Sequence, residues 1–484
     1  MPAKHLRQET GGGIATPFHR HRTEILLPRP SMIRHTQRAN SIITMNSAFS
    51  RRDFLKRATI AGAAPFILPS RLWAAPTPPN SLITIGCIGM GNQGRGLLGN
   101  CLGRDDVRVV AVCDVDTTRR NSAKEKVESR YADALGKGAY TGCAAFNDFR
   151  QLLARKDIDA VVIATPDHWH ALTSIAAAKA GKDIYCEKPM SHTVREGRAM
   201  VKATRRHNRV FQVGSMQRSS TEFRASCELI RNGVIGSISS VDVAVGGPPK
   251  PCDLSAEPDE PGLDWNFWLG PAPVRPYNSI LSPRGARYTF FPDWRNYCEY
   301  GSGGVGDWGA HHFDIVQWAL GFDSSGPVEF IPPDDPKAGH GARFRYSTGV
   351  EVTHRSGNDI TFHGSKGKIH VNRGKFELWI GDQRKADDVK EASQMLKEYL
   401  PPDAVRLYNS SNHLSDWLSS IRSRKPPICD VETGHRTASI CELVNLTYWH
   451  HQTLKWNPAK EHFIDGTGDP KWLGQLYRKP WRLS

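Results

Sequence analysis

The sequence predicts an α/β protein whose N-terminal half forms a doubly wound parallel sheet, followed by an α+β domain with an open, mostly antiparallel sheet. The first prediction rests on apolar runs that alternate with helical segments from Leu82 to about Val213, because strands joined through helices form parallel sheets with right-handed crossovers. The second rests on five short, partly alternating segments between 342 and 380, each bounded by Gly, Asn or Ser. With 484 residues, the chain is long enough for two domains.

We expect the first domain to occupy residues 80–214 and the second residues 215–430. Residues 431–484 contain a predicted helix and a Trp- and Pro-rich end, which we expect to pack on both domains. In chain order, the first domain has predicted strands at 82–88, 107–113, 158–164, 183–186 and 211–213, and predicted helices from about 95 and at 122–135, 146–153, 167–181 and 193–207. The second has predicted strands at 237–245, 342–346, 350–354, 359–363, 368–371 and 376–380.

The stretch 82–116 has the pattern of a dinucleotide-binding Rossmann turn, in which a buried strand leads through a glycine-rich loop into a helix. Gly89 permits the tight turn, Gly91 lets backbone N–H groups approach a pyrophosphate, and Gly94 lets the helix pack closely on the strand. The helix N-terminus supplies free N–H donors and a partial positive charge. The same glycine spacing also occurs in ordinary strand–helix turns, so the flanking strand and helix carry the prediction.

The end of the second predicted strand indicates which nucleotide is bound. Asp114 follows Gly94 by twenty residues and can accept hydrogen bonds from a ribose diol. Its charge would repel a 2′-phosphate, which favours NAD. NADP remains possible because Arg119 and Arg120 follow closely and could meet a phosphate.

Two further strand ends carry polar motifs on the same sheet edge as the glycine turn. Thr165-Pro166 is followed by His168-Trp169-His170, and Glu187-Lys188-Pro189 closes the next strand. Ligands of open parallel sheets bind beyond the carboxyl ends of the strands, so these residues are candidates for the site. A structural role is equally consistent with His168 and Trp169, and Lys188 alone could be a solvated lysine before a turn.

A second motif with candidate catalytic residues lies in the glycine-rich segment 301–314. Asp307 and His311 are four residues apart, so on one helix they would share a face. A carboxylate there could orient His311 and favour its protonated state, and an imidazole with a pKa near neutrality suits proton abstraction from a hydroxyl. Lys188 could supply a cation near the developing ketone oxygen. The alternative is a helix-start acid paired with a capping histidine.

These motifs together resemble the Gfo/Idh/MocA oxidoreductase family, which includes glucose–fructose oxidoreductase and inositol dehydrogenase. The resemblance covers about residues 82–450, and its most specific piece is Glu187-Lys188-Pro189 at a strand end. It implies catalytic roles for Lys188, Asp307 and His311. It also implies cofactor contacts, which we assign to Gly89, Gly91, Asn92, Gly94, Asp114, Thr165, Pro166, His170, Glu187 and Lys188. Weaker candidates for substrate contact are His168, Trp169, Trp294, Arg295, His312 and Asp314. Trp294 and Arg295 could instead belong to an aromatic core, and His312 could face the core.

Composition argues against several other classes of function. Residues 1–80 hold 12 Lys and Arg against 3 Asp and Glu, and so account for nine of the net +15 charges. The remaining chain is only mildly basic and has no basic stripe with interleaved aromatics, so we expect no nucleic-acid partner. The ten cysteines form neither a CxxC pair nor a Cys/His group with zinc spacing, so we expect no metal site.

The N-terminal segment has the features of an export signal. Residues 50–56 read Ser-Arg-Arg-Asp-Phe-Leu-Lys, and a short apolar stretch at 58–68 precedes small residues. This pattern is similar to a twin-arginine signal over residues 45–76, which predicts contact with the Tat translocase and a periplasmic or exported protein. The apolar stretch is too short to span a bilayer, although an uncleaved signal could act as a tether. Residues 1–44 precede an internal Met45, so we interpret them as a spurious or disordered extension.

Three functions remain open at this stage. The first is an exported NAD(P)-dependent oxidoreductase that transfers a hydride between a secondary alcohol of a sugar, polyol or cyclitol and a tightly bound nicotinamide cofactor. The second is an NAD-dependent glycosidase that acts by transient oxidation and elimination, although the intact Glu187-Lys188-Pro189 argues slightly against it. The third is an inactive binding or regulatory protein of the same fold. We also expect a homo-oligomer, since one face of the predicted second sheet could build a subunit interface.

Overall fold

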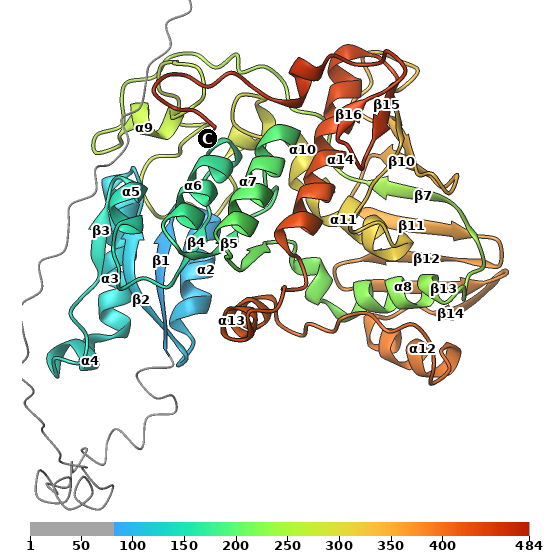
Figure 1. The fold of residues 1–484 in the computed structure, drawn as a ribbon, viewed down its shortest axis with the longest axis horizontal. Helices are drawn as coiled ribbons and strands as arrows, with labels where there is room; N and C mark the ends of the chain where they lie inside the picture. The colour runs from blue at the N-terminus through green and yellow to red at the C-terminus, as the bar shows by residue number, and fades with distance from the viewer. Residues whose placement is uncertain (1–81, 484) are drawn as a thin grey trace, which may run out of the picture. The chain divides into compact units, whose positions relative to one another are not determined.

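A computed structural model of the protein describes residues 82–483, which form two sheets joined by helices (Figure 1). The predicted signal at 45–76 and the extension 1–44 lie outside these described residues. Among the helices of residues 82–483, none is both long and apolar enough to cross a membrane.

The first sheet has six parallel strands in the order β3-β2-β1-β4-β5-β6. Its strands are β1 (Ile83–Ile88), β2 (Val107–Cys113), β3 (Ala144–Phe146), β4 (Ala160–Ile163), β5 (Asp183–Cys186) and β6 (Phe211–Val213). Its helices are α2 (Asn92–Leu102), α3 (Thr117–Arg130), α4 (Ala132–Gly136), α5 (Phe149–Leu153), α6 (Asp167–Lys179) and α7 (Val194–Arg206). The strand order reverses between β1 and β4, and this switch point is where open parallel sheets bind ligands.

Both faces of this sheet are buried, which explains why its strands read as continuous apolar runs. In β4, Ala160 and Val162 pack in one core cluster with Leu97 and Leu98 of α2. Val161 and Ile163 belong to the other cluster, on the face covered by α5 and α6. The predicted doubly wound parallel sheet is therefore confirmed.

The second sheet has ten strands in the order β14-β13-β12-β11-β7-β10-β9-β8-β15-β16. Its strands are β7 (Ile238–Ala244), β8 (Glu329–Ile331), β9 (Arg343–Arg345), β10 (Glu351–Arg355), β11 (Asp359–Gly364), β12 (Gly367–Asn372), β13 (Lys375–Ile380), β14 (Gln383–Ala386), β15 (Leu454–Asn457) and β16 (His462–Phe463). Only the β7–β10 pair is parallel. Burial alternates along β10, β11 and β13, so one face packs and the other is turned toward solvent. The prediction of an open, mostly antiparallel sheet is confirmed.

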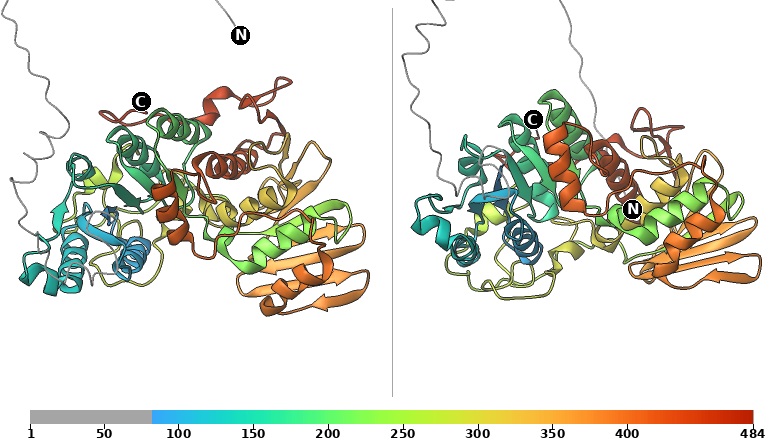
Figure 2. Two further views of the ribbon diagram at one scale, coloured as in Figure 1. Left: turned by 60° about the horizontal axis from the view of Figure 1, so that its bottom comes forward. Right: turned by 90° about the horizontal axis from the view of Figure 1, so that it is seen from below.

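Helices cover the packed face of the second sheet, as Figure 2 shows for α8 and α12. The helices of this part are α8 (Thr221–Arg231), α9 (Trp265–Leu269), α10 (Gly303–Asp307), α11 (Gly309–Leu320), α12 (Ala392–Tyr399), α13 (His413–Ser423) and α14 (Val431–His450). Short 3-10 turns occupy Met216–Ser219, Asp293–Asn296, Val389–Glu391 and Pro470–Leu473.

The C-terminal segment is part of the second sheet as well as a cover over the helices. α14 packs against both α7 and α11, and β15 pairs antiparallel with β8 through Leu454 and Phe330. The tail strands β15 and β16, of four and two residues, are too short to show a period in the sequence, which is why only a packing tail was predicted.

Candidate active site

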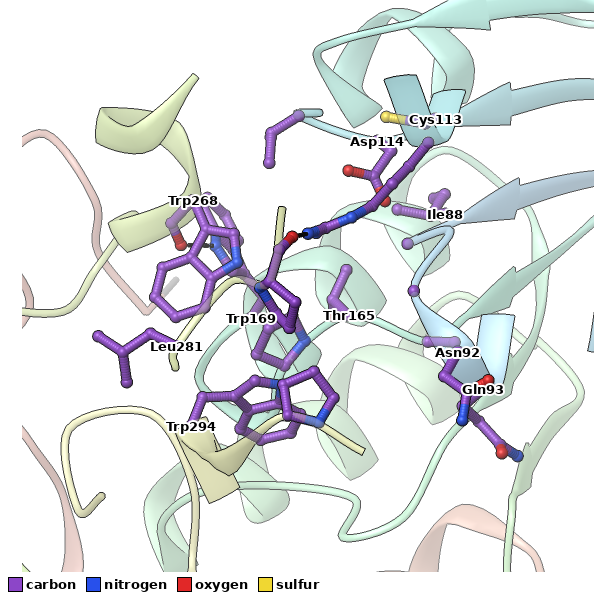
Figure 3. Close-up of a pocket in the computed structure, with 18 of the residues that line it drawn as sticks. Ile88, Asn92, Gln93, Cys113, Asp114, Thr165, Trp169, Trp268, Leu281 and Trp294 are labelled. Carbon is purple, nitrogen blue, oxygen red and sulfur yellow. Dashed lines mark hydrogen bonds between the residues drawn. The ribbon is translucent and has the colours of Figure 1, made fainter. Parts of the chain in front are cut away.

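The first pocket lies at the carboxyl ends of β1, β2 and β4, and we call it the glycine-turn pocket (Figure 3). Gly89 has φ +86°, and a Cβ there would lie 2.6 Å from the Ala164 carbonyl oxygen. A Cβ on Gly94 would lie 1.8 Å from the Gly89 carbonyl oxygen. The turn therefore requires glycine at both positions for the conformational and packing reasons that the sequence suggested.

The N-terminus of α2 faces this pocket and is free to receive an anion. Its N-cap is Gly91, and no side chain caps the helix. The nearest atom that a Cβ on Gly91 would meet is the Tyr288 hydroxyl, at 3.3 Å. The Thr165 and Thr173 hydroxyl groups also line the pocket, and both are buried without a hydrogen-bond partner among the described residues. This donor set fits a dinucleotide, with phosphates at the helix end and further polar groups along the wall.

Asp114 sits at the end of β2, where its carboxylate lines the same pocket. It accepts hydrogen bonds from the backbone N–H groups of Met90 (2.6 Å) and Asp116 (2.8 Å), which fix its orientation. Burial raises its pKa. Both nearby arginines have protein partners, since Arg119 faces Asp116 at 3.6 Å and Arg120 donates to the Asp114 carbonyl at 2.6 Å.

A loop from the second half of the chain, residues 281–295, closes the glycine-turn pocket on its open side. Asn92 donates from its amide to the Thr289 carbonyl (3.0 Å), and Arg95 donates to the Tyr288 carbonyl. The guanidinium groups of Arg95 and Arg119 lie 4.8 and 5.2 Å from the centre of the Tyr288 ring. In Figure 3, Trp268 and Trp294 lie across the pocket from Asp114 and Asn92.

A second pocket adjoins the first, and we call it the Lys188 pocket because Lys188 lies on its wall. The two pockets share Gln93, Ala164, Thr165, Phe291, Trp294 and Arg295. Asp307 and His311 also line the Lys188 pocket. The structure thus brings together the three residues predicted to be catalytic and connects them to the glycine turn.

Lys188 and Asp307 form an ion pair at the base of this pocket. The Lys188 ammonium donates to Asp307 Oδ1 at 2.5 Å and to the Asp307 carbonyl at 3.0 Å. Arg295 Nε lies 3.5 Å from the same carboxylate. Burial would raise the pKa of Asp307, but these two cations outweigh it and hold the pKa below its usual range. Asp307 therefore remains ionised and keeps the ammonium aimed into the pocket.

Models of known protein families match two parts of this chain. A family model described as "Oxidoreductase family, NAD-binding Rossmann fold" matches residues 83–215, and one described as "Oxidoreductase family, C-terminal alpha/beta domain" matches residues 252–483. The chain belongs to the Gfo/Idh/MocA oxidoreductase family.

Individual relatives of the family match this chain over shorter stretches. A glycosyl hydrolase family 109 protein from Solibacter usitatus is 33% identical over 171 residues, which cover 33% of this chain and 37% of that protein. A levoglucosan dehydrogenase from Pseudarthrobacter phenanthrenivorans is 33% identical over 175 residues, 36% of each chain. The matched region thus spans little more than a third of these relatives.

Among solved structures, the WlbA dehydrogenase from Bordetella pertussis, in complex with NADH and UDP-GlcNAcA, covers 78% of this chain and 98% of its own. Its TM-score is 0.54 and its sequence identity 18%, so this likeness concerns the fold alone.

Contrary to the prediction, Asp307 does not orient His311 in this Gfo/Idh/MocA site. The helix breaks at Trp308, so that Asp307 ends α10 and His311 lies inside α11. The Asp307 carboxylate turns to Lys188, and the buried His311 Nδ1 has no partner among residues 82–483. Burial first, and then the charges of Lys188 and Arg373, hold the pKa of His311 well below its usual value. The imidazole is therefore neutral, not protonated.

His170 positions the site but does not face either pocket. Its Nδ1 lies 2.8 Å from the Pro189 carbonyl and its Nε2 lies 2.9 Å from the Thr165 carbonyl. Burial lowers its pKa to about 4. The prediction that His170 contacts the cofactor is wrong, because the side chain is buried and lines neither pocket. Both ring nitrogens lie against backbone carbonyls, and the neutral imidazole donates its single N–H to one of them. His170 instead ties two strand-end turns together, and the other predicted cofactor residues Thr165, Pro166 and Glu187 do line the pockets.

Four weaker candidates for substrate contact prove to be structural or peripheral. The Trp169 indole donates to the Trp268 carbonyl at 2.9 Å and only borders the glycine-turn pocket, while His168 is bound to the same carbonyl and lines neither pocket. His312 lies 2.6 Å from the Asn358 amide oxygen. Asp314 is fully buried in an ion pair with Arg218. Neither His312 nor Asp314 borders either pocket, so the predicted substrate contacts are wrong for both.

Trp294 and Arg295 do reach the site, as predicted, since both border both pockets. The sequence did not indicate Tyr288, Phe291 or Arg373, which also line these pockets. They come from loops without a motif, and only their arrangement in space brings them to the strand ends.

Proposed function

We propose that this protein oxidises or reduces a secondary alcohol of a sugar, polyol or cyclitol with a nicotinamide dinucleotide. The observation that carries the proposal is the opening of the Lys188 pocket, with its Lys188–Asp307 pair and neutral His311, directly into the glycine-turn pocket. The levoglucosan dehydrogenase relative supports a carbohydrate substrate. Asp114, at the end of β2, favours NAD over NADP.

The chain's own residues account for the proton chemistry of such a reaction. When bound, the nicotinamide supplies the hydride acceptor or donor for the carbinol carbon. His311, being neutral, can take the hydroxyl proton as the carbonyl forms. Lys188, held by Asp307, places positive charge beside the oxygen on which negative charge develops. Trp294 borders both pockets and is buried, so it helps to exclude water from the reacting groups.

We further propose that the nucleotide stays bound through many turnovers and is recycled by a second substrate. The loop 281–295 supports this, because its hydrogen bonds to Asn92, Arg95 and Arg119 hold it over the glycine-turn pocket. The test is mass spectrometry of what denatured, purified protein releases, and NAD is the expected product. Protein that carries no nucleotide, and turns over only with added NAD, would contradict the recycling.

A second candidate function is an NAD-dependent glycosidase that oxidises the sugar transiently and then eliminates the aglycone. The glycosyl hydrolase family 109 relative favours it, since it is 33% identical over 171 residues. Release of p-nitrophenol from aryl glycosides, dependent on NAD, distinguishes this activity from a net dehydrogenase. Loss of either activity in Lys188→Ala and His311→Ala variants would also exclude an inactive binding protein.

We also propose that residues 45–76 direct export through the Tat translocase and that the mature protein is a homo-oligomer. The motif at 50–56 supports export, and the double variant Arg51→Lys, Arg52→Lys is expected to remain in the cytoplasm. Unchanged export of this variant would contradict the proposal. The oligomeric state is measured by light scattering on the mature protein.

A further inference from the structure

Arg373 brings a positive charge to the Lys188 pocket from the second sheet. It occupies the two-residue turn between β12 and β13, next to Gly374, which has φ +69°. The turn is anchored on both sides, since Asn372 donates to the Asn358 carbonyl and the Gly374 N–H donates to Glu222 Oε1 at 3.3 Å. Arg373 therefore lies in an anchored hairpin turn. Its side chain lines the Lys188 pocket and is exposed to solvent.

The contacts of Arg373 leave the end of its side chain available. The guanidinium carbon lies 4.7 Å from the centre of the Trp308 ring. When the Gln217 amide oxygen faces Arg373, it accepts a hydrogen bond from Arg373 Nε at 3.2 Å. The Gln217 amide nitrogen then donates to the His311 carbonyl, also at 3.2 Å. The two terminal nitrogens have no acceptor among residues 82–483.

The other charged side chains of the pocket already have partners on the protein. Lys188 and Arg295 both face the Asp307 carboxylate, at 2.5 and 3.5 Å. Glu187 accepts a hydrogen bond from Gln93 at 2.7 Å. Burial raises the pKa of Asp167 well above its usual range, and this carboxyl group is not within ion-pair distance of Arg373. Arg373 is therefore the cation of this pocket that lacks a carboxylate within ion-pair distance.

We propose that Arg373 binds a carboxylate on the substrate, and that this protein acts on sugar acids, an inference that rests on the function proposed above. A guanidinium presents two parallel N–H donors that match a carboxylate, and such charge-assisted pairs are stronger than bonds to a neutral hydroxyl. Trp308 contacts both Arg373 and the His311 ring, whose centre lies 5.9 Å from its own. A sugar acid on this indole would reach Arg373 with its carboxylate and His311 with a ring hydroxyl.

The test compares D-glucuronate with D-glucose, which differ only in a carboxylate in place of a CH2OH group, and includes glucose 6-phosphate as a third ligand. Binding is measured by calorimetry on the nucleotide-loaded protein, and oxidation by reduction of the bound nucleotide. We expect glucuronate to bind roughly 10- to 100-fold more tightly than glucose, and Arg373→Gln to abolish this preference. Lys375→Gln is the matched control, since Lys375 lies two positions away, pairs with Glu377 at 3.3 Å and does not line the pocket.

Equal binding of glucuronate and glucose, or a preference that persists in Arg373→Gln, would overturn the inference. Tighter, Arg373-dependent binding of glucose 6-phosphate than of glucuronate would overturn the assignment to a carboxylate. If glucuronate binds in an Arg373-dependent manner but no sugar reduces the nucleotide, the proposed function fails while the assignment of Arg373 stands.

Discussion

Two ion pairs, Lys188–Asp307 and Arg218–Asp314, involve aspartates from one stretch of the chain but differ in burial and in hydrogen bonding. Asp307 and Asp314 are seven residues apart in the chain, and each faces a cation from beyond a strand of the first sheet. The side chains of Arg218 and Asp314 are 1% and 0% exposed, whereas those of Lys188 and Asp307 are 17% and 24% exposed. The Arg218–Asp314 pair is therefore sealed in the core, whereas the Lys188–Asp307 pair opens to a pocket.

Hydrogen bonding separates the two pairs further. Arg218 donates to Asp314 at 2.6 and 2.9 Å and to Asp323 at 2.7 Å, and Thr437 donates to Asp314 at 2.8 Å. The Lys188 ammonium, in contrast, has two acceptors, both on Asp307. A fully satisfied pair stabilises the fold, whereas a partly satisfied pair that faces a pocket retains a donor for substrate.

The largest expected effect on stability comes from Arg218→Ala. The substitution leaves Asp314 buried with its main partner gone, so we expect a loss of about 3–5 kcal/mol in the free energy of unfolding. Urea denaturation of the mature protein measures it. Lys137→Ala is the control, because its pair with Asp133 is 66% and 98% exposed, and we expect a change below about 1 kcal/mol. If Arg218→Ala and Lys137→Ala lost similar amounts of unfolding free energy, burial of the Arg218–Asp314 pair would not contribute to stability as we expect.

For His311→Ala we expect kcat to fall by about 10²- to 10⁴-fold, because the general base is lost. The pH profile of the wild type tests the neutral imidazole. Since burial, Lys188 and Arg373 lower the pKa of His311, the base stays unprotonated as the pH falls below 6.5, and activity should decline only at lower pH. An acidic limb of kcat/KM at or above pH 6.5 would show that this interpretation is wrong.

In the Lys188–Asp307 pair, the substitution that corresponds to Arg218→Ala is Lys188→Ala. We expect it to lower kcat by about 10²- to 10³-fold. Its effect on the free energy of unfolding should be smaller than that of Arg218→Ala, because Arg295 still lies 3.5 Å from Asp307. Steady-state kinetics and urea denaturation of the same samples measure both quantities. A variant that unfolds more readily but keeps its kcat would assign Lys188–Asp307 to the structure instead of the chemistry.

The smallest expected effect is that of Asn358→Ala, which tests His312 as a structural residue. The substitution removes the amide oxygen 2.6 Å from His312 Nε2 and should cost about 1–2 kcal/mol of unfolding free energy. We expect kcat and KM to remain unchanged, because His312 lines neither pocket. A rise in KM without loss of stability would indicate that His312 contacts the substrate after all.

The motif-bearing part of the site could be predicted from the sequence because its geometry is local. Gly89 and Gly94 are required by a turn only a few residues long, and parallel strands place Lys188 and Asp114 at one sheet edge wherever the rest of the chain lies. The role of Asp307 could not be predicted in this way. Spacing alone placed Asp307 and His311 on one helix face, and the break at Trp308 was not visible in the periodicity.

Strand alternation and glycine spacing are local properties of the chain, and for this reason the fold class and the dinucleotide turn could be predicted from the sequence. The partners of the two aspartates, the neutral state of His311 and the approach of Arg373 from the β12–β13 turn could be found only from the folded arrangement. The physical reason is that ion pairing and desolvation depend on neighbours from distant parts of the chain, and no local pattern records them.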